Sequence, residues 1–236
     1  MTHKRASDLS VEERAEIIRQ SDLGAHVDAS LYLKLATGST AVDYHRRRLI
    51  YRTGDKSDLL YIIARGRVKL SRPEAAGTRE AVIDILSAGA LFGESALYAP
   101  GMRDKCAVAY ETVRLLCLPS REFQKLMAEH RELYDYTFRL VGQRLAQAER
   151  RVADFALDTI PARLEKLLVE FSKRYGVREN GGLLIDLALP HREIASIVGS
   201  TRESVTVRLN ALRRAGIIDI VDRKILIKRP ESLATL

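Results

Sequence analysis

Arg202 and Glu203 stand next to each other at the start of a predicted helix near the C-terminus. An arginine can donate two hydrogen bonds to guanine O6 and N7, and a glutamate can accept one from cytosine N4. The adjacent pair could therefore read neighbouring base pairs, with about 1–3 kcal/mol of discrimination from each good bidentate contact. Nearby hydroxyl and cationic side chains could bind phosphate, although each could equally be an ordinary solvated surface group. The candidate DNA-contacting residues are His191, Arg192, Ser200, Thr201, Arg202, Glu203, Ser204, Thr206, Arg208, Arg223 and Lys224.

Two short helices joined by a tight turn are predicted to position these residues. The first opens at Pro190 and ends at Gly199, since glycine adopts the left-handed conformation without a Cβ penalty. Ser200 and Glu203 have the spacing of a capping box, which predicts the start of the second helix. The pattern predicts a helix-turn-helix, with an ordinary helical hairpin as the alternative. The second helix is expected to bury Val205, Leu209 and Leu212.

A hairpin is predicted directly after these helices. Residues 217–221 and 224–228 have the pattern of two strands joined by a turn at Asp222 and Arg223. Arg223 and Lys224 would lie at the tip of this wing, where a cation is placed to contact phosphate.

A long helix is predicted over residues 132–158. Its apolar residues are spaced three and four apart, as in the a and d positions of a coiled coil. A seam this narrow favours pairing with a second copy of the chain, although the helix could also lie on its own domain. The predicted dimer-interface residues are Phe138, Val141, Leu145, Ala148, Val152 and Phe155.

Short β-rich runs recur between about residues 40 and 118, separated by glycine-containing turns. Many short strands at regular spacing predict an all-β barrel or sandwich. Ser10 and Glu13 have the spacing of a capping box and predict a short helix before it. The predicted strands cover residues 48–52, 59–63, 67–70, 81–86, 106–110 and 113–118, with a later strand at 183–189.

The segment from His191 to Val205 resembles the helix-turn-helix of the cyclic-AMP receptor protein/FNR (CRP/FNR) family. The segments Gly54-Asp55, Leu60–Val68 and Phe92–Ala96 are similar to the barrel motifs of cyclic-nucleotide-binding domains. The resemblance covers the whole chain in order.

This resemblance implies an α+β protein with an N-terminal β-barrel of jelly-roll type, a dimerisation helix and a C-terminal winged helix-turn-helix. The expected domains are residues 1–131, 132–158 and 159–236, with a hinge at Asp158. The family's third base-reading position, usually an arginine, falls on Val207. Valine cannot bond guanine, although it could contact a thymine methyl group. Arg208 is rotated from Val207 by about 100°, so we do not expect it to take over this position.

The resemblance also implies an effector site in the barrel. Gly93, Glu94 and Ser95 match the glycine-led turn and the carboxylate for ribose hydroxyls, and Arg103 matches the phosphate ligand. Asp104 would repel a phosphodiester. The loop from Glu94 to Arg103 is one residue shorter than in the cyclic-AMP receptor. At the two positions where that receptor binds adenine through hydroxyl side chains, this chain has Ala148 and Glu149. Cyclic AMP is therefore not expected to be the effector, and no other effector or cofactor is indicated.

Composition limits the remaining choices. The net charge of +8, concentrated in the C-terminal third, is weak support for a polyanionic partner. No apolar run approaches the roughly 20 residues of a membrane span, and the N-terminus lacks the features of a secretory signal, so we expect a cytoplasmic protein. Two cysteines, Cys106 and Cys117, cannot hold a cluster that needs four thiolates, and the five histidines show no ligand spacing.

Two functions are compared. The first is a homodimeric regulator that activates or represses transcription through DNA and RNA polymerase. The second is a ligand-gated interaction module whose helix-turn-helix is structural. Arg202, Glu203 and the basic wing favour the first. Enzymatic activity is not expected, because no nucleophile–base set, metal motif or phosphate-binding loop is present in the sequence.

Overall fold

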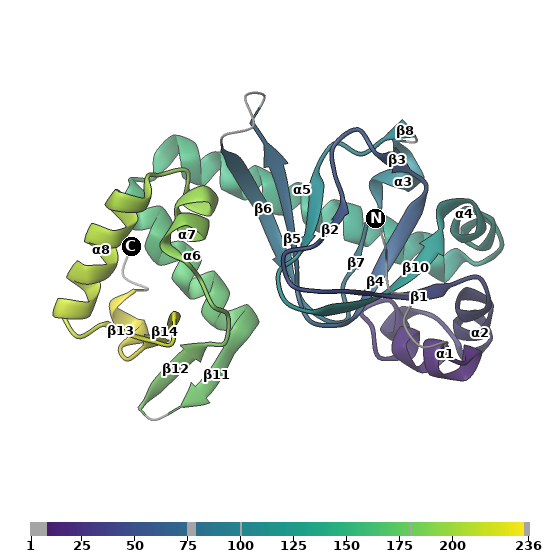
Figure 1. Ribbon diagram of the computed structural model, residues 1–236, viewed down its shortest axis with the longest axis horizontal. Helices are drawn as coiled ribbons and strands as arrows, with labels where there is room; N and C mark the ends of the chain where they lie inside the picture. The colour runs from purple at the N-terminus through teal and green to yellow at the C-terminus, as the bar shows by residue number, and fades with distance from the viewer. Residues whose placement is uncertain (1–8, 75–78, 100, 180, 234–236) are drawn as a thin grey trace. The chain divides into compact units, whose positions relative to one another are not determined.

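The computed structural model describes residues 9–74, 79–99, 101–179 and 181–233 (Figure 1). The chain divides into two compact units, the first ending at Leu145 and the second beginning at Ala146. This division falls inside one helix, α5 (Arg131–Leu157). The sequence predicted three domains, with the long helix as a separate domain, and this division stays a prediction. Among the described residues, no helix combines the length and the apolar character needed to cross a membrane.

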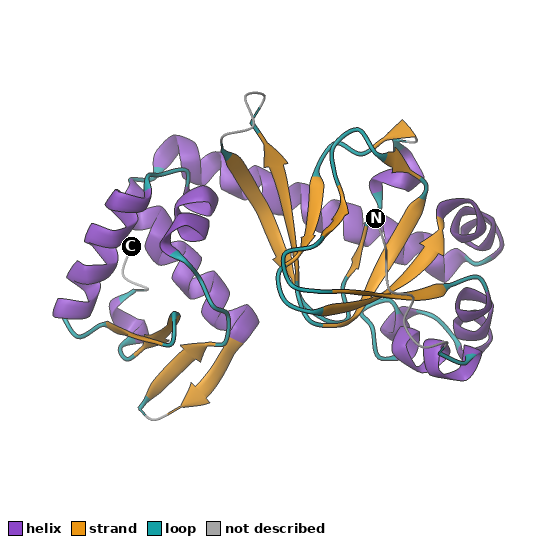
Figure 2. Cartoon of the chain, in the orientation of Figure 1, coloured by secondary structure: helices purple, strands orange, loops and turns teal. Residues whose placement is uncertain are grey.

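The first unit is built around two four-stranded antiparallel sheets (Figure 2). Their strand orders are β1-β10-β4-β7 and β2-β9-β5-β6, and β3 and β8 pair separately. The predicted all-β domain is confirmed, and β1, β3, β7 and β8 are strands that the sequence did not reveal. The bounds are β1 Thr40–Tyr44, β2 Leu49–Tyr51, β3 Lys56–Ser57, β4 Leu59–Arg65, β5 Val68–Pro73, β6 Glu80–Leu86, β7 Leu91–Phe92, β8 Gly101–Met102, β9 Cys106–Ala109 and β10 Val113–Pro119.

The sheet that contains β4 and β10 is buried on both faces. Tyr61 and Ile63 of β4 pack into a core shared with the other sheet. Leu60 and Ile62, which alternate with them, pack into a second core with the helices. Successive side chains of a strand point to opposite faces, so the continuous apolar run in β4 reflects two hydrophobic contacts.

Helices at both ends of the first unit supply that second core. The predicted capping box at Ser10 is confirmed, because the Ser10 hydroxyl accepts from the Glu13 amide while the Glu13 side chain accepts from the Ser10 amide. Leu31 and Phe123 are among the buried helical residues. The bounds are α1 Val11–Arg19, η1 Gly24–His26, α2 Ala29–Thr37, α3 Ser95–Tyr98 and α4 Ser120–Glu129.

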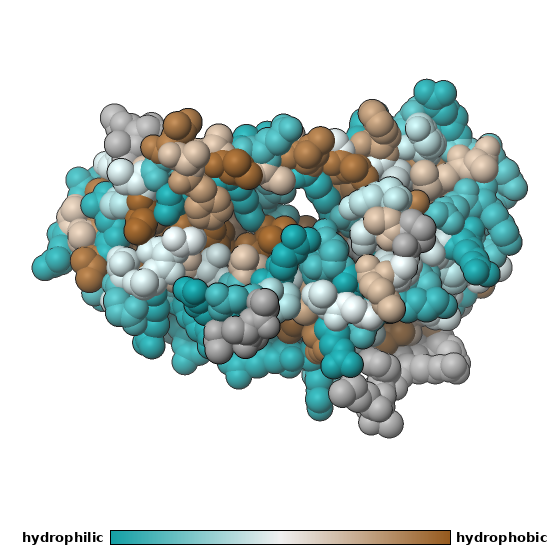
Figure 3. Space-filling view, turned by 90° about the horizontal axis from the view of Figure 1, so that it is seen from above, coloured by the Kyte–Doolittle hydropathy of each residue, from teal (hydrophilic) through white to brown (hydrophobic). Residues whose placement is uncertain are grey.

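Helix α5 leaves much of its predicted seam exposed. The exposed fractions are 71% for Phe138, 59% for Leu145, 67% for Val152 and 47% for Phe155. Exposing apolar side chains to water costs free energy, roughly 25 cal/mol for each Å² of apolar surface that a partner could bury. Figure 3 shows hydrophobic side chains lying among hydrophilic ones on one face of the molecule.

The second unit is a helical domain with a small sheet of order β11-β12-β14-β13. Helix α6 buries Leu164, Leu167, Leu168 and Phe171, whose three- and four-residue spacing puts them on one face. The hairpin of β13 and β14 is confirmed. The bounds are α6 Ile160–Tyr175, β11 Gly176–Glu179, β12 Gly182–Ile185, α7 His191–Val198, α8 Arg202–Arg214, β13 Ile218–Val221, β14 Lys224–Ile227 and η2 Pro230–Ser232.

Two local predictions in this unit are wrong. The strand expected at residues 183–189 ends at Ile185, because the amides of Asp186 and Leu189 bond to Tyr175 and Arg223 outside the strand ladder. The second helix begins at Arg202 with Thr201 as its N-cap, so Ser200 and Glu203 form no capping box.

Gly199 is required at the turn between α7 and α8 for two reasons. Its φ of 63° lies in the left-handed region, as predicted. A Cβ there would also lie 2.6 Å from the ring of Phe155, which is far below van der Waals contact. The turn and the end of α5 therefore pack directly against each other inside the second unit.

A buried ion pair joins α6 to α8. The Nε atom of Arg208 donates to Glu165 Oε1 at 2.9 Å, and a second guanidinium nitrogen contacts the same oxygen. The Glu165 side chain is 3% exposed, whereas that of Arg208 is 35% exposed. Burying the carboxylate is favourable only while the arginine compensates its charge.

Because Glu165 is more deeply buried than Arg208, replacing one or the other should lower the stability of the second unit by different amounts. Arg208→Leu should destabilise the second unit by about 3–5 kcal/mol, because a buried carboxylate loses its cation. Glu165→Leu should destabilise it less, since water reaches the remaining arginine, and the double variant should recover most of the loss. Hydrogen exchange of the α8 amides in the full-length protein measures these differences. Equal effects of the two single variants would contradict this explanation.

Candidate DNA interface and effector site

The start of α8 presents polar groups whose orientation is set by its cap. The Thr201 hydroxyl accepts a hydrogen bond from the Ser204 amide at 3.2 Å and donates one to the Ser204 hydroxyl at 3.0 Å. Arg202 and Glu203 follow in the first turn, and all four side chains are exposed. The free amides of a helix N-terminus also carry partial positive charge, which favours an anion there.

His191, the first residue of α7, is tied to α8 through Thr206. The Thr206 hydroxyl donates its single proton to the carbonyl of Arg202 at 2.8 Å. His191 Nδ1, which lies 2.7 Å from the same oxygen, must therefore be a donor. The neutral ring then offers only an acceptor at Nε2. Burial and the positive charge of Arg202 lower the pKa of His191 below its ordinary value.

Three other predicted contact residues differ in their environments. Arg192 is exposed at the start of α7. The Ser200 hydroxyl oxygen is buried and has no hydrogen-bond partner among the described residues, so it is not placed to meet phosphate. The Arg208 guanidinium is held by the buried Glu165, which argues against its predicted role in DNA contact.

The wing turn is formed by two residues with positive φ, Asp222 at 48° and Arg223 at 65°. Positive φ at both central residues is the geometry of a type I′ hairpin turn. The carbonyl of Arg223 accepts from the Leu189 amide, which anchors the turn to the segment before α7. The Arg223 side chain is exposed, whereas Lys224 forms an ion pair with Asp186 at 2.5 Å. The exposed cation of the tip is therefore Arg223.

In the first unit, Glu94 is a buried carboxylate held by two cations. It is 2% exposed and forms ion pairs with Arg144 of α5 and, at 3.8 Å, with Lys105. Burial by itself would raise the pKa of Glu94, but Arg144 and Lys105 outweigh burial and lower it. Arg144 also donates to the carbonyl of Leu91 at 2.7 Å, so one side chain links α5 to β7 and Glu94.

Arg103 is buried beside this cluster. Its guanidinium donates to the carbonyls of Gly93, at 3.0 Å, and Leu59. It also lies 4.3 Å from the centre of the Tyr51 ring, a cation–π contact. A Cβ at Gly93 would come within 3.1 Å of Arg103, so glycine permits this approach.

Asp104 forms its own ion pair at the surface. Its carboxylate pairs with Arg72 at 2.7 Å, and its side chain is 49% exposed. Arg103, by contrast, is 2% exposed, and Ser95 is buried. Asp104 therefore has a cation of its own at the surface, and its predicted repulsion of a bound anion stays a prediction.

Sequence reasoning missed Lys105, Arg144 and Glu165. A buried glutamate requires a cation, so a partner for Glu94 could have been anticipated. Nothing in the spacing singled out Arg144, which lies 50 positions away in the chain. Glu165 was hidden within an amphipathic helix whose charged residues are otherwise mostly solvated.

The two cysteines are free thiols with different exposure. Burial raises the pKa of Cys117 to about 12, so little thiolate is available for oxidation. Cys106 is partly exposed, and its Sγ lies 3.8 Å from the Thr53 hydroxyl. No group of three His, Cys, Asp or Glu residues within the described ranges could hold a metal ion.

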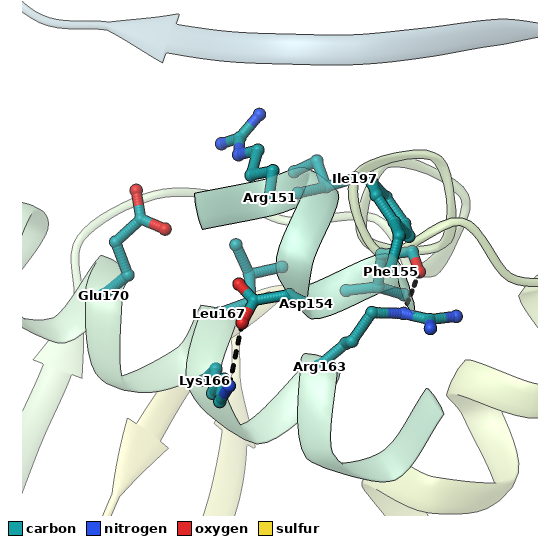
Figure 4. A pocket seen from close by; sticks show the side chains of 9 residues that line it. Arg151, Asp154, Phe155, Arg163, Lys166, Leu167, Glu170 and Ile197 are labelled. Carbon is teal, nitrogen blue, oxygen red and sulfur yellow. Dashed lines mark hydrogen bonds and ion pairs between the residues drawn. The ribbon is translucent and has the colours of Figure 1, made fainter. Parts of the chain in front are cut away.

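A small cavity lies between the end of α5 and the helices α6 and α7 (Figure 4). Beside the cavity, Lys166 forms ion pairs with Asp154 at 2.8 Å and with Asp158 at 2.5 Å. The cavity volume of about 50 Å³ is well below the roughly 300–1,000 Å³ typical of small-molecule sites. We therefore regard this cavity as a packing void.

Comparisons with known proteins agree with this arrangement. Residues 41–130 match the cyclic nucleotide-binding domain model, and residues 162–236 match the Crp-like helix-turn-helix domain model. A CRP-like cAMP-activated global transcriptional regulator of Mycobacterium tuberculosis is 29% identical over 93% of this chain and 97% of that protein. A global nitrogen regulator of Nostoc is 31% identical over 87% of this chain and 94% of that protein.

Solved structures share the fold. A CRP/FNR-family transcriptional regulator from Thermus thermophilus has a TM-score of 0.66 at 28% identity, covering 82% of this chain and 95% of that one. The c-di-GMP responsive global regulator of Xanthomonas campestris has a TM-score of 0.74 at 21% identity, covering 85% and 99%. At this low identity, the similarity to the Xanthomonas regulator shows a shared fold and no more. With both domain models matched in order and relatives similar over nearly their whole length, the chain belongs to the CRP/FNR family of transcription regulators.

Proposed function

We propose that this chain is a homodimeric transcription regulator that reads DNA with α8. The observation that carries the proposal is the exposed first turn of α8, where Arg202 and Glu203 project from a capped helix end. These side chains have the hydrogen-bonding groups that distinguish guanine and cytosine in the major groove. Thr201, Ser204, His191 and the wing residue Arg223 would contact phosphate and position the helix.

Dimerisation would use the exposed seam of α5. Phe138, Leu145 and Val152 are each more than half exposed at seven-residue intervals, which suits a partner helix. Phe155 would have a second role, because it also packs on Gly199. A two-fold dimer would bind two half-sites roughly 34–36 Å apart.

The regulator would act on RNA polymerase in the cytoplasm. Gly93, Glu94, Ser95 and Arg103 retain residue types that could bind a cyclic nucleotide. However, Arg103 is occupied by backbone carbonyls, and Glu94 by Arg144. A nucleotide would have to displace these contacts. We therefore keep the prediction that cyclic AMP is not the effector.

Substitutions on α8 and on the wing should affect DNA binding differently. Arg202→Ala should relax specificity at one base pair, with a loss of about 1–3 kcal/mol on the preferred site. Arg223→Ala should weaken binding to all sequences and reduce the salt slope, d log K/d log [salt], by about one. Fluorescence anisotropy with promoter-derived and random duplexes at several salt concentrations measures both effects. Wild-type protein that binds both classes of duplex equally would refute the regulator function.

The dimer proposal predicts that Leu145→Glu produces monomers, because two carboxylates would face each other in an apolar seam. Light scattering and sedimentation measure the mass. Leu33→Glu is the matched control, because Leu33 is 50% exposed on α2, outside the seam, and this variant should remain dimeric. A Leu145→Glu protein that stays dimeric would show that the interface lies elsewhere.

Binding of phosphate by His191 predicts that DNA affinity depends on pH. The pKa of His191 is lowered in the free protein, and a phosphate at Nε2 would stabilise the protonated ring and raise it. Affinity should therefore increase as pH falls through the pKa of the complex, by at most about tenfold per unit, and level off below the pKa of the free protein. His191→Gln should abolish the dependence, whereas His45→Gln, an exposed histidine of the first unit, should leave it unchanged. The same slope in wild type and His191→Gln would exclude this contact.

A further inference from the structure

Helix α8 has one face that is directed away from its own domain. Val205, Leu209 and Leu212 are buried and define the inner face. At about 100° per residue, Val207 lies almost opposite their mean direction. It is 66% exposed, an apolar side chain at the middle of the outer face. Spacings of three, four and seven residues place the other outward side chains on the same ridge, namely Glu203, Asn210 and Arg214.

The neighbouring cation cannot replace Val207 on this face. Arg208 is rotated by about 100° toward the inside and is held by Glu165 through two guanidinium nitrogens. Releasing it would leave the carboxylate of Glu165, which is 3% exposed, without its partner. The ion pair therefore keeps the Arg208 guanidinium away from the middle of the outer face.

The surface around Val207 is open and mostly polar. Val207 is the one apolar side chain in a group with Asn210, Arg213 and Arg214 on α8. Asn210 and Arg214 are exposed and can donate hydrogen bonds to phosphates or base edges. Arg213 is also exposed but pairs with Asp219 at 3.1 Å. An apolar patch with a cationic and polar rim suits a methyl group on a base in the major groove.

We propose that Val207 selects thymine at one base pair of each half-site by apolar contact with the C5-methyl group. This inference rests on the proposed function, in which α8 enters the major groove. Among the four unmodified bases, thymine alone presents a methyl group there. Guanine would present two hydrogen-bond acceptors, but the valine side chain has no donor. Cytosine would present an amino group, but the valine side chain has no acceptor. Both would lose hydrogen bonds to water without replacement.

The first experiment selects preferred sites from random duplexes with the full-length protein. Wild type should select a T·A pair at one position of each half-site. Val207→Arg should change that position to G·C and leave the positions read by Arg202 and Glu203 unchanged. Val177→Ala is the control, because Val177 is 53% exposed on β11 and the variant should select the wild-type site.

The second experiment removes only the methyl group. Replacing thymine by uracil at the selected position should weaken wild-type binding about three- to fivefold, the effect of one buried methyl-sized group. Val207→Ala should bind the thymine and uracil duplexes more nearly equally, and uracil at a thymine outside the half-sites should have no effect.

The outcomes separate the two levels of the proposal. Selection of G·C opposite Val207 by wild type, or equal affinity of wild type for the thymine and uracil duplexes, would overturn the role of Val207 while the regulator function stands. Recovery of no preferred sequence at all would instead refute the regulator function itself.

Discussion

The rotation of α8 about its axis is the constraint on which the DNA-facing surface depends. Three apolar residues, Val205, Leu209 and Leu212, fix one face of the helix in the core. The ion pair between Arg208 and Glu165 adds a directional contact at one flank. Each residue is rotated by about 100° from the next, so the rotation of α8 about its axis makes Val207 face outward and Arg208 inward. A shift of one residue in this register would turn Arg208 outward and move Val207 to the flank of the helix.

The cap and the turn before α8 set where the helix starts. Gly199 combines a left-handed conformation with close contact to Phe155, so the turn is tied to the end of the long helix. Thr201 then caps the helix and brings Arg202 and Glu203 into its first turn. Phe155, near the end of α5, therefore contacts the turn that precedes α8 directly.

The candidate effector residues of the first unit already have partners for their charges and hydrogen bonds. Glu94 is buried, and its charge is balanced by Arg144 and Lys105. Arg103 lies next to Gly93 and donates to backbone carbonyls. The same residues therefore form a self-contained polar cluster that connects the sheets to α5. Any effector would have to provide interactions that replace these contacts.

The sequence by itself determined the all-β first domain, the long helix, the wing, the turn at Gly199 and the pair Arg202 and Glu203, because these follow from local periodicity, turn chemistry and motif spacing. It misplaced the cap at Ser200, since two adjacent hydroxyl residues can both start a helix and only packing selects one. Tertiary structure alone decided that Arg208 belongs to Glu165, Asp104 to Arg72 and Glu94 to Arg144. These partners lie 43, 32 and 50 positions apart, so no local pattern links them. Charges of either sign are common on a surface, and only the folded chain shows which of them are brought together.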